Sequence, residues 1–230
     1  FKWPLAFLAA LLWLAVTLAR GGARRHAHLW WMPVLMVLGV AIFVGRLGIG
    51  IRYVLPIVPF LCVGLGGLAA TRLGARRLRA AFLAALALVV LEGVEMAAHA
   101  PWHLSFFNAA VGGPVKGQWL VNDSNVDWGQ GLLALKAELD RRGIHHVHLT
   151  AHGTVDPAIY GIESTPYLGG KPGRESDYLA ISSYYFVGLS QVMMTAQGRT
   201  QFRLQIDSSP LRAMEPLAMP AGCMLLYRIR

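Results

Sequence analysis

Residues 118–131 have the sequence QWLVNDSNVDWGQG and form the stretch that is densest in polar side chains. The stretch is followed by leucines at 132, 133, 135 and 139, a helical spacing that continues up to Arg142. Asp127 occupies the N-cap position for that segment. The pattern therefore predicts a strand at 119–121, a polar loop, and a helix at 127–142.

The polar side chains of this loop have two interpretations. Asp123, Asn125, Asp127 and Gln130 are candidates to contact a cation or a sugar, because alternating oxygen side chains in a tight loop can face one hard ion. The alternative is that they cap the helix and bind their own backbone, as Asx residues commonly do. An EF-hand is excluded, since the loop lacks the Gly and Glu that this motif requires.

The composition indicates a membrane protein. The chain has 230 residues, of which 55% are hydrophobic and only 14% charged. Apolar runs at about 4–19, 29–44, 53–70 and 80–98 predict four transmembrane helices within residues 1–99. The mixed composition of residues 100–230 predicts a water-facing domain. The predicted fold class is thus a membrane α-helical part followed by a small α/β extracytoplasmic domain.

Clusters of positive charge lie in loops between the predicted transmembrane helices. The formal net charge is +9, but two clusters of arginines fall in short inter-helix loops, at 20–25 and 72–79. Such clusters follow the positive-inside rule and contact membrane lipids, which argues against nucleic-acid binding. Both loops then face the cytoplasm. We expect a multi-pass protein of the inner (cytoplasmic) membrane with residues 100–230 periplasmic or extracellular.

Strands and helices alternate in the second part of the chain. Strands are predicted at 119–121, 147–151, 178–182 and 224–229, helices at 127–142 and 185–196, and a helical turn at Asp156. This alternation is typical of an α/β layer domain.

Histidines and arginines supply two further candidate groups. His146, His148 and His152 have strand parity and could present imidazoles to zinc, but no further ligand follows at zinc spacing, so we assign no metal ligand. The cofactor stays open, with a divalent cation as the candidate. Arg46 and Arg52 suit a lipid phosphate, because a guanidinium matches phosphate oxygens in a fork, with unspecific headgroup contact as the alternative.

Three segments together resemble the C-terminal part of bacterial membrane glycosyltransferases of the GT-C class, specifically family 39 and the dolichyl-phosphate-mannose protein mannosyltransferase-like group. The first is GIRYVLPIVP at 50–59. The second comprises PWHLSFFN at 101–108, GGP at 112–114 and DSNVDWGQ at 123–130. The third is DPAIYGI at 156–162. The resemblance covers about residues 45–165.

The resemblance implies an enzyme that moves a sugar from a polyprenyl-phosphate donor to an acceptor at the outer face of the membrane. The family's catalytic carboxylate lies in a first outward loop to which no segment here corresponds, so no catalytic residue is assigned. Residues 52 and 53 match the Arg-Tyr pair of the family's first segment, and this match implies that Arg52 holds the donor phosphate. The chain is expected to be a C-terminal fragment whose partner is the missing N-terminal half. The alternative is a non-catalytic, membrane-anchored subunit whose α/β domain binds a protein partner or a glycan.

Overall fold

The computed structural model describes residues 8, 9, 11, 12, 28–43, 55–69, 75–194 and 201–230. The chain divides into two compact units. One comprises Phe1–Pro101 with Phe107–Ala110, and the other comprises Trp102–Phe106 with Val111–Arg230.

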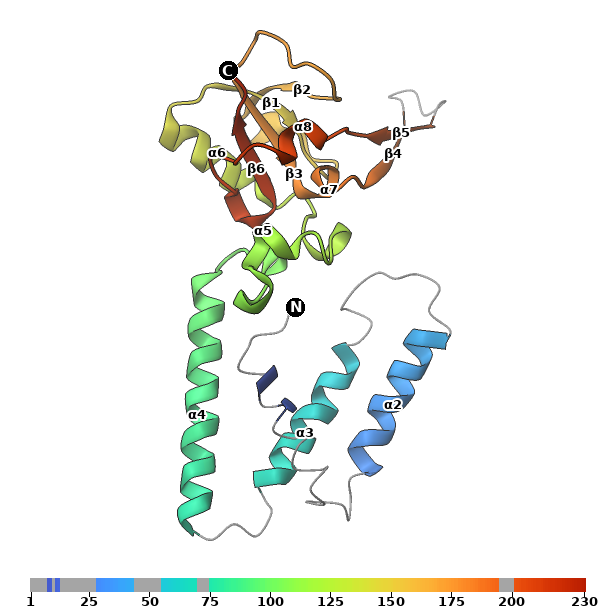
Figure 1. The fold of residues 1–230 in the computed structure, drawn as a ribbon, viewed down its shortest axis with the longest axis vertical. Coiled ribbons are helices and arrows are strands. Elements are labelled where there is room, and N and C mark those ends of the chain that lie inside the picture. The colour runs from blue at the N-terminus through green and yellow to red at the C-terminus, as the bar shows by residue number, and fades with distance from the viewer. Residues whose placement is uncertain (1–7, 10, 13–27, 44–54, 70–74, 195–200) are drawn as a thin grey trace. The chain divides into compact units, whose positions relative to one another are not determined.

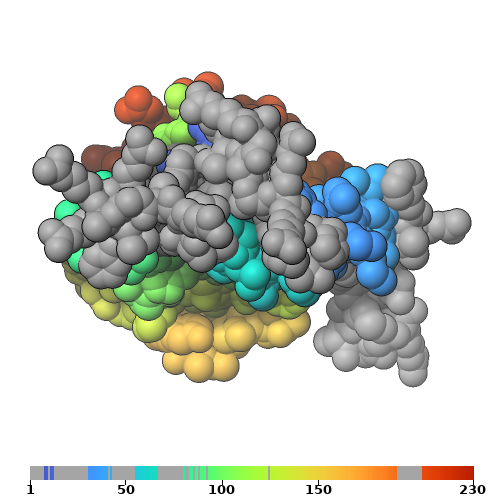
Figure 2. Space-filling view, turned by 90° about the horizontal axis from the view of Figure 1, so that it is seen from below, coloured from blue at the N-terminus to red at the C-terminus, as the bar shows by residue number. Residues whose placement is uncertain are grey.

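The first unit is helical. Its elements are α2 (His28–Phe43), η3 (Leu55–Ile57), α3 (Val58–Ala69) and α4 (Ala75–Ala98). Helices α2 and α3 lie side by side (Figures 1 and 2). Val34 of α2, Ile57 of η3 and Leu61 of α3 form a small buried cluster. Apolar contact between these segments therefore holds this helical pair together.

The prediction of four transmembrane helices is wrong. No helix in the described part of the chain is both long and apolar enough to cross a membrane. Helices α2 and α3 have 16 and 12 residues, whereas a span needs about 20. Helix α4 has 24 residues, but its uncharged part runs only from Ala80 to Leu91, between Arg79 and Glu92. The first predicted span, 4–19, lies almost entirely outside the described residues.

The second unit contains the sheets. Its strands are β1 (His146–Thr150), β2 (Glu163–Pro166), β3 (Tyr178–Ser182), β4 (Ser190–Met194), β5 (Gln201–Gln205) and β6 (Met224–Arg228). Its helices are η4 (His103–Ser105), α5 (Gly113–Gly117), η6 (Asp123–Asn125), α6 (Gly131–Arg142), η7 (Pro157–Tyr160), α7 (Ser183–Phe186), α8 (Ser209–Arg212) and η8 (Pro220–Gly222), with η5 (Ala109–Val111) at the boundary of the two units. This order confirms an α/β fold for the second half of the chain.

The main sheet is mixed, with strand order β2-β1-β3-β6 (Figure 1). Strand β1 pairs in parallel with β2 on one side and β3 on the other, and β6 is antiparallel to β3. Strands β4 and β5 form a separate antiparallel pair. The carboxyl ends of β1, β2 and β3 therefore meet at one edge of the sheet, where β6 begins.

The two faces of the main sheet are buried against different partners. Register pairs place Leu149 of β1, Ala180 of β3 and Leu226 of β6 on one face. Helix α6 lies on that side, since a Cβ on Gly131 would come within 2.6 Å of Met224 Cγ. The opposite face packs in one cluster with the aromatic residues of α7 and with Leu211 of α8. Burial on both faces fixes the sheet as the core of the unit.

Three predicted elements differ from the structure. Residues 119–121 are turns rather than a strand, because their N–H groups donate back to the carbonyls of Lys116 and Gly117. Helix α6 begins at Gly131 rather than at Asp127. The predicted helix at 185–196 ends after one turn, where Gly188 takes φ +93°, and Ser190–Met194 then pairs with β5.

Candidate functional site

The polar loop lies at the carboxyl edge of the main sheet. Asp127 is joined to Ser182 at the end of β3, and Gly129 approaches His152 just after the end of β1. A Cβ on Gly129 would be 3.0 Å from the His152 carbonyl oxygen, so this close approach requires glycine, whose φ is +87°. In open α/β sheets, ligands bind at the carboxyl ends of the strands where neighbouring connections diverge. The junction of β1 and β3 is such a position.

Asp127 is the centre of a buried polar cluster. Its side chain is fully buried. One carboxylate oxygen, Oδ2, accepts a hydrogen bond from the Ser182 hydroxyl, and the other, Oδ1, accepts one at 2.8 Å from the Gly129 N–H. Gln130 Nε2 of the same loop donates to the sulfur of Cys223, just before β6, at 3.7 Å, and the Cys223 side chain helps to lower the Asp127 pKa. Asp127 therefore joins the loop to β3, and Gln130 joins it to the start of β6.

Burial raises the pKa of Asp127 above its ordinary value of 3.8. Hydrogen bonds from Ser182 and Gly129, the electrostatic interaction with His152 and the Cys223 side chain oppose this rise, but desolvation is the larger effect. Burial also raises the pKa of Tyr185 to about 12, with Tyr184 and Asp127 adding to the effect. The Tyr185 hydroxyl therefore keeps its proton at neutral pH.

An aromatic group adjoins this cluster. The His152 ring stacks on Tyr184 with centroids 4.1 Å apart and an interplanar angle of 15°. The Trp128 ring meets His152 edge-on, with centroids 6.5 Å apart. Trp128 is 61% exposed, whereas Tyr184 is only 9% exposed. We call Trp128, His152 and Tyr184 the Trp128 platform, a set of aromatic rings that runs from the core to the surface.

The structure places the predicted contact residues of the loop as follows. Asn125 is buried and donates to the Asn122 carbonyl at 3.0 Å. Gln130 donates to the Val126 carbonyl at 2.8 Å and accepts from the Trp128 N–H at 2.7 Å. These are the backbone bonds that the capping interpretation expects. Gln130 thereby fixes the backbone that carries Trp128.

Asp123 differs from its neighbours because it is exposed. Its backbone adopts φ +60°, an unusual value for a residue other than glycine, and its N–H donates to Asn122 Oδ1 at 2.8 Å. The Asn122 side chain also donates to the Ser183 carbonyl at 3.3 Å, which ties the loop to α7. The Asp123 carboxylate therefore faces solvent from a well-anchored turn.

The other predicted candidates lie apart from this site. Arg46 and Arg52 fall outside the described residues. His146 and His148 share one face of β1, with ring centroids 6.2 Å apart, whereas His152 lies beyond the strand. Among residues that the structure describes, no group of three or more His, Cys, Asp or Glu is arranged to hold a metal ion.

The sequence analysis did not assign Trp128, Ser182, Tyr184 or Cys223 to the site. Ser182 and Tyr184 follow directly in the sequence SSYY at the end of a correctly predicted strand, and that signal was available. His152 was considered only as a zinc ligand. Cys223 gave no local signal, because its nearness to Asp127 depends on the pairing of β6 with β3.

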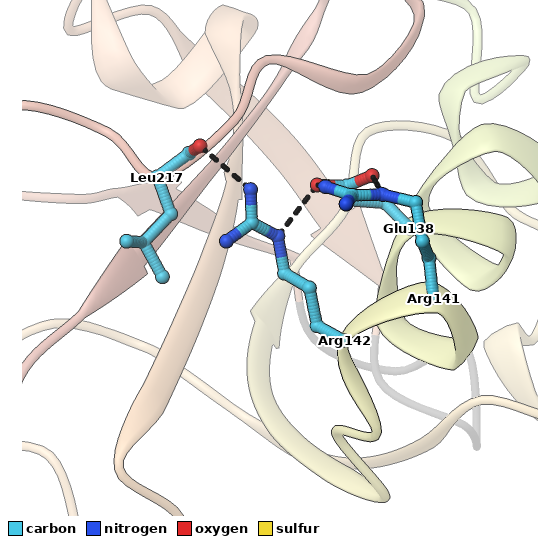
Figure 3. Close-up of polar contacts among 4 residues, drawn as sticks. All are labelled: Glu138, Arg141, Arg142 and Leu217. Atoms are coloured by element: carbon cyan, nitrogen blue, oxygen red, sulfur yellow. Dashed lines mark hydrogen bonds and ion pairs between the residues drawn. The ribbon is translucent and has the colours of Figure 1, made fainter.

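A second polar cluster lies on α6 (Figure 3). Glu138 accepts hydrogen bonds from Arg141 Nε at 2.8 Å and from Arg142 Nε at 2.6 Å, and Arg142 also donates to the Leu217 carbonyl at 3.0 Å. A surface pocket of about 430 Å³ adjoins this cluster, with Trp102 and Met219 in its lining. Glu138 pairs with both arginines, and the bond from Arg142 to Leu217 fastens α6 to the segment before β6.

Glu138→Gln is expected to remove part of the acid sensitivity of the protein. Hydrogen bonds from Arg141, then Arg142, lower the pKa of Glu138 to about 2 from 4.5. A lowered folded-state pKa stabilises the fold above pH 4.5, and this contribution is lost as the pH falls towards about 2. Urea denaturation at several pH values between these limits measures the loss.

Glu163→Gln, at an exposed carboxylate of β2, is the matched control for removing one negative charge. An acid-induced loss of stability that is as steep in Glu138→Gln as in the wild type would contradict the prediction.

Comparison of the chain with protein-family models, with curated proteins and with solved structures found no match.

Proposed function

We propose that the α/β unit binds a saccharide at the Trp128 platform. The observation that carries this proposal is the exposed Trp128 indole, which meets the His152 ring edge-on, while His152 in turn stacks on the buried Tyr184. A sugar ring has an apolar C–H face that packs on an aromatic ring and hydroxyl groups that need polar partners. Ligand sites in proteins combine these elements, with aromatic side chains and a few placed polar groups.

Asp123 of the loop and His152, which follows β1, are the candidate polar partners for the sugar hydroxyls. The exposed Asp123 carboxylate accepts hydrogen bonds, and the His152 imidazole can donate or accept. Two hydrogen bonds hold the loop. One joins the Asp127 carboxylate to the Ser182 hydroxyl, and the other joins the Asn122 side chain to the Ser183 carbonyl. A site that is already ordered loses little conformational entropy when the ligand binds.

Recognition of an acceptor sugar is the role that this site would have in a glycosyltransferase with a polyprenyl-phosphate donor. In that enzyme, Arg46 and Arg52 are the candidates to hold the donor phosphate. The alternative is a non-catalytic subunit that binds the glycan alone. The two differ in one measurement: transfer of labelled sugar from a polyprenyl-phosphate donor to the bound saccharide supports the enzyme, and binding without transfer supports the subunit.

Trp128→Ala is expected to weaken saccharide binding by about tenfold or more, because truncating an aromatic anchor at the centre of a site removes its largest contact area. The experiment titrates the full chain with mannose, glucose and N-acetylglucosamine oligosaccharides and follows tryptophan fluorescence and saturation-transfer NMR.

Ile159→Ala is the control for this test, since Ile159 is 75% exposed but lies outside the platform. It should bind as the wild type does, and Trp128→Phe should retain part of the affinity. If Trp128→Ala and the wild type bind the saccharide with equal affinity, the proposal that the Trp128 platform binds it is refuted.

A further inference from the structure

A polar pocket lies where the end of α7, the end of β5 and α8 meet. Its volume is about 400 Å³, and its lining includes Gly188, Gln205, Asp207, Ser209 and Arg212. None of these residues belongs to the Trp128 platform. Arg212 provides the positive charge of the lining and Asp207 the negative charge.

The Arg212 guanidinium is held on several sides. Its Nε donates to Ser208 Oγ at 3.3 Å, and Nη2 donates to the Phe186 carbonyl at 3.3 Å. Its central carbon lies over the Trp119 ring, 4.8 Å from the centroid, a distance at which a cation is attracted to the ring face. Because these contacts fix the guanidinium, a ligand would not have to order a flexible side chain.

Both hydrogen bonds of this guanidinium within the described part of the chain use Nε and Nη2, so Nη1 is left for a ligand. Gly188, with φ +93°, lies beside the guanidinium, and a Cβ at that position would be 3.7 Å from Nη2. The absence of a side chain there keeps the approach to the guanidinium open. Nearby, the Asp207 carboxylate accepts a hydrogen bond from the Ser209 N–H at 3.0 Å.

We propose that this pocket binds an oxyanion group, a carboxylate or a phosphate, of a small ligand through Arg212. A guanidinium presents parallel N–H groups that match two oxygens of such a group, and charge-assisted bonds of this kind are the strong ones. Asp207, whose carboxylate is attracted by the Arg212 charge, and Gln205 also line the pocket, and their oxygens favour a ligand that has hydroxyl groups beside the oxyanion. This site is separate from the saccharide site and does not depend on it.

The test titrates the full chain, labelled with ¹⁵N-arginine, with methyl phosphate and, separately, with acetate. We expect a saturating shift of the Arg212 Nε–H resonance, with no such shift for Arg141, which is also exposed but is paired with Glu138. Tighter binding of methyl phosphate assigns a phosphate group, and tighter binding of acetate assigns a carboxylate.

Arg212→Lys, which keeps the charge but loses the fork, should weaken binding about tenfold. Arg141→Lys, the matched control, should leave it unchanged. Thermal unfolding of both variants shows whether they are folded. Equal, non-saturating shifts of Arg212 and Arg141 in the wild type, or unchanged affinity in a folded Arg212→Lys, would overturn the proposal.

Discussion

Asp127→Ala is expected to lower the free energy of unfolding of the α/β unit by about 2 kcal/mol, because it leaves the buried Ser182 hydroxyl and the half-buried Gly129 N–H without their acceptor. Asp127→Asn should be milder, since an amide is nearly isosteric and can bond to both groups. Urea denaturation followed by near-ultraviolet circular dichroism measures the difference.

A double-mutant cycle with Ser182→Ala tests the cause of this loss. If the hydrogen bond between the two side chains is responsible, the double variant loses less stability than the sum of the single variants. Additive losses would show that the two side chains act independently and would contradict the assignment.

The stability lost in Asp127→Ala should also depend on pH. The folded-state pKa of Asp127 is raised above 3.8, so in the window between 3.8 and the raised value the folded state binds more protons than the unfolded state. Stability contributed by this group therefore falls as the pH rises through that window. The difference between the wild type and Asp127→Ala should be larger at acidic pH than at neutral pH.

Leu135→Ala is expected to lower the free energy of unfolding by about 3 kcal/mol, through lost burial and the cavity left behind. Leu135 is fully buried on α6, whereas Leu133 on the same helix is 58% exposed. Leu133→Ala is thus the matched control and should change stability by less than about 0.5 kcal/mol. Similar losses in both variants would mean that α6 does not pack through Leu135.

The polar loop illustrates how far sequence reasoning reached at the site. The density of Asp, Asn and Gln in 118–131 identified the stretch, and its position before a helix was correct. The role expected for Asp127 as N-cap was wrong. The residue instead bonds to Ser182, 55 positions along the chain. A local pattern cannot distinguish an N-cap from a long-range partner, because both use the same carboxylate.

The sequence by itself determined the elements whose signals are local. Strand β3 has its predicted bounds, Tyr178–Ser182, and the Asp156 cap of η7 accepts a hydrogen bond from the Ala158 N–H at 2.9 Å. Alternation, helical spacing and turn residues act over a few positions, so they can be recognised without the fold.

Only the tertiary structure decided which side chains from distant segments of the chain come into contact. Apolar runs at 29–44, 53–70 and 80–98 predicted membrane spans, but the helices that form there are too short or too interrupted by charge. The stacking of His152 on Tyr184 and the placing of Arg212 over Trp119 arise only when strands, loops and short helices meet. Hydropathy measures how apolar a segment is, whereas the positions of side chains in space depend on which segments pair and pack.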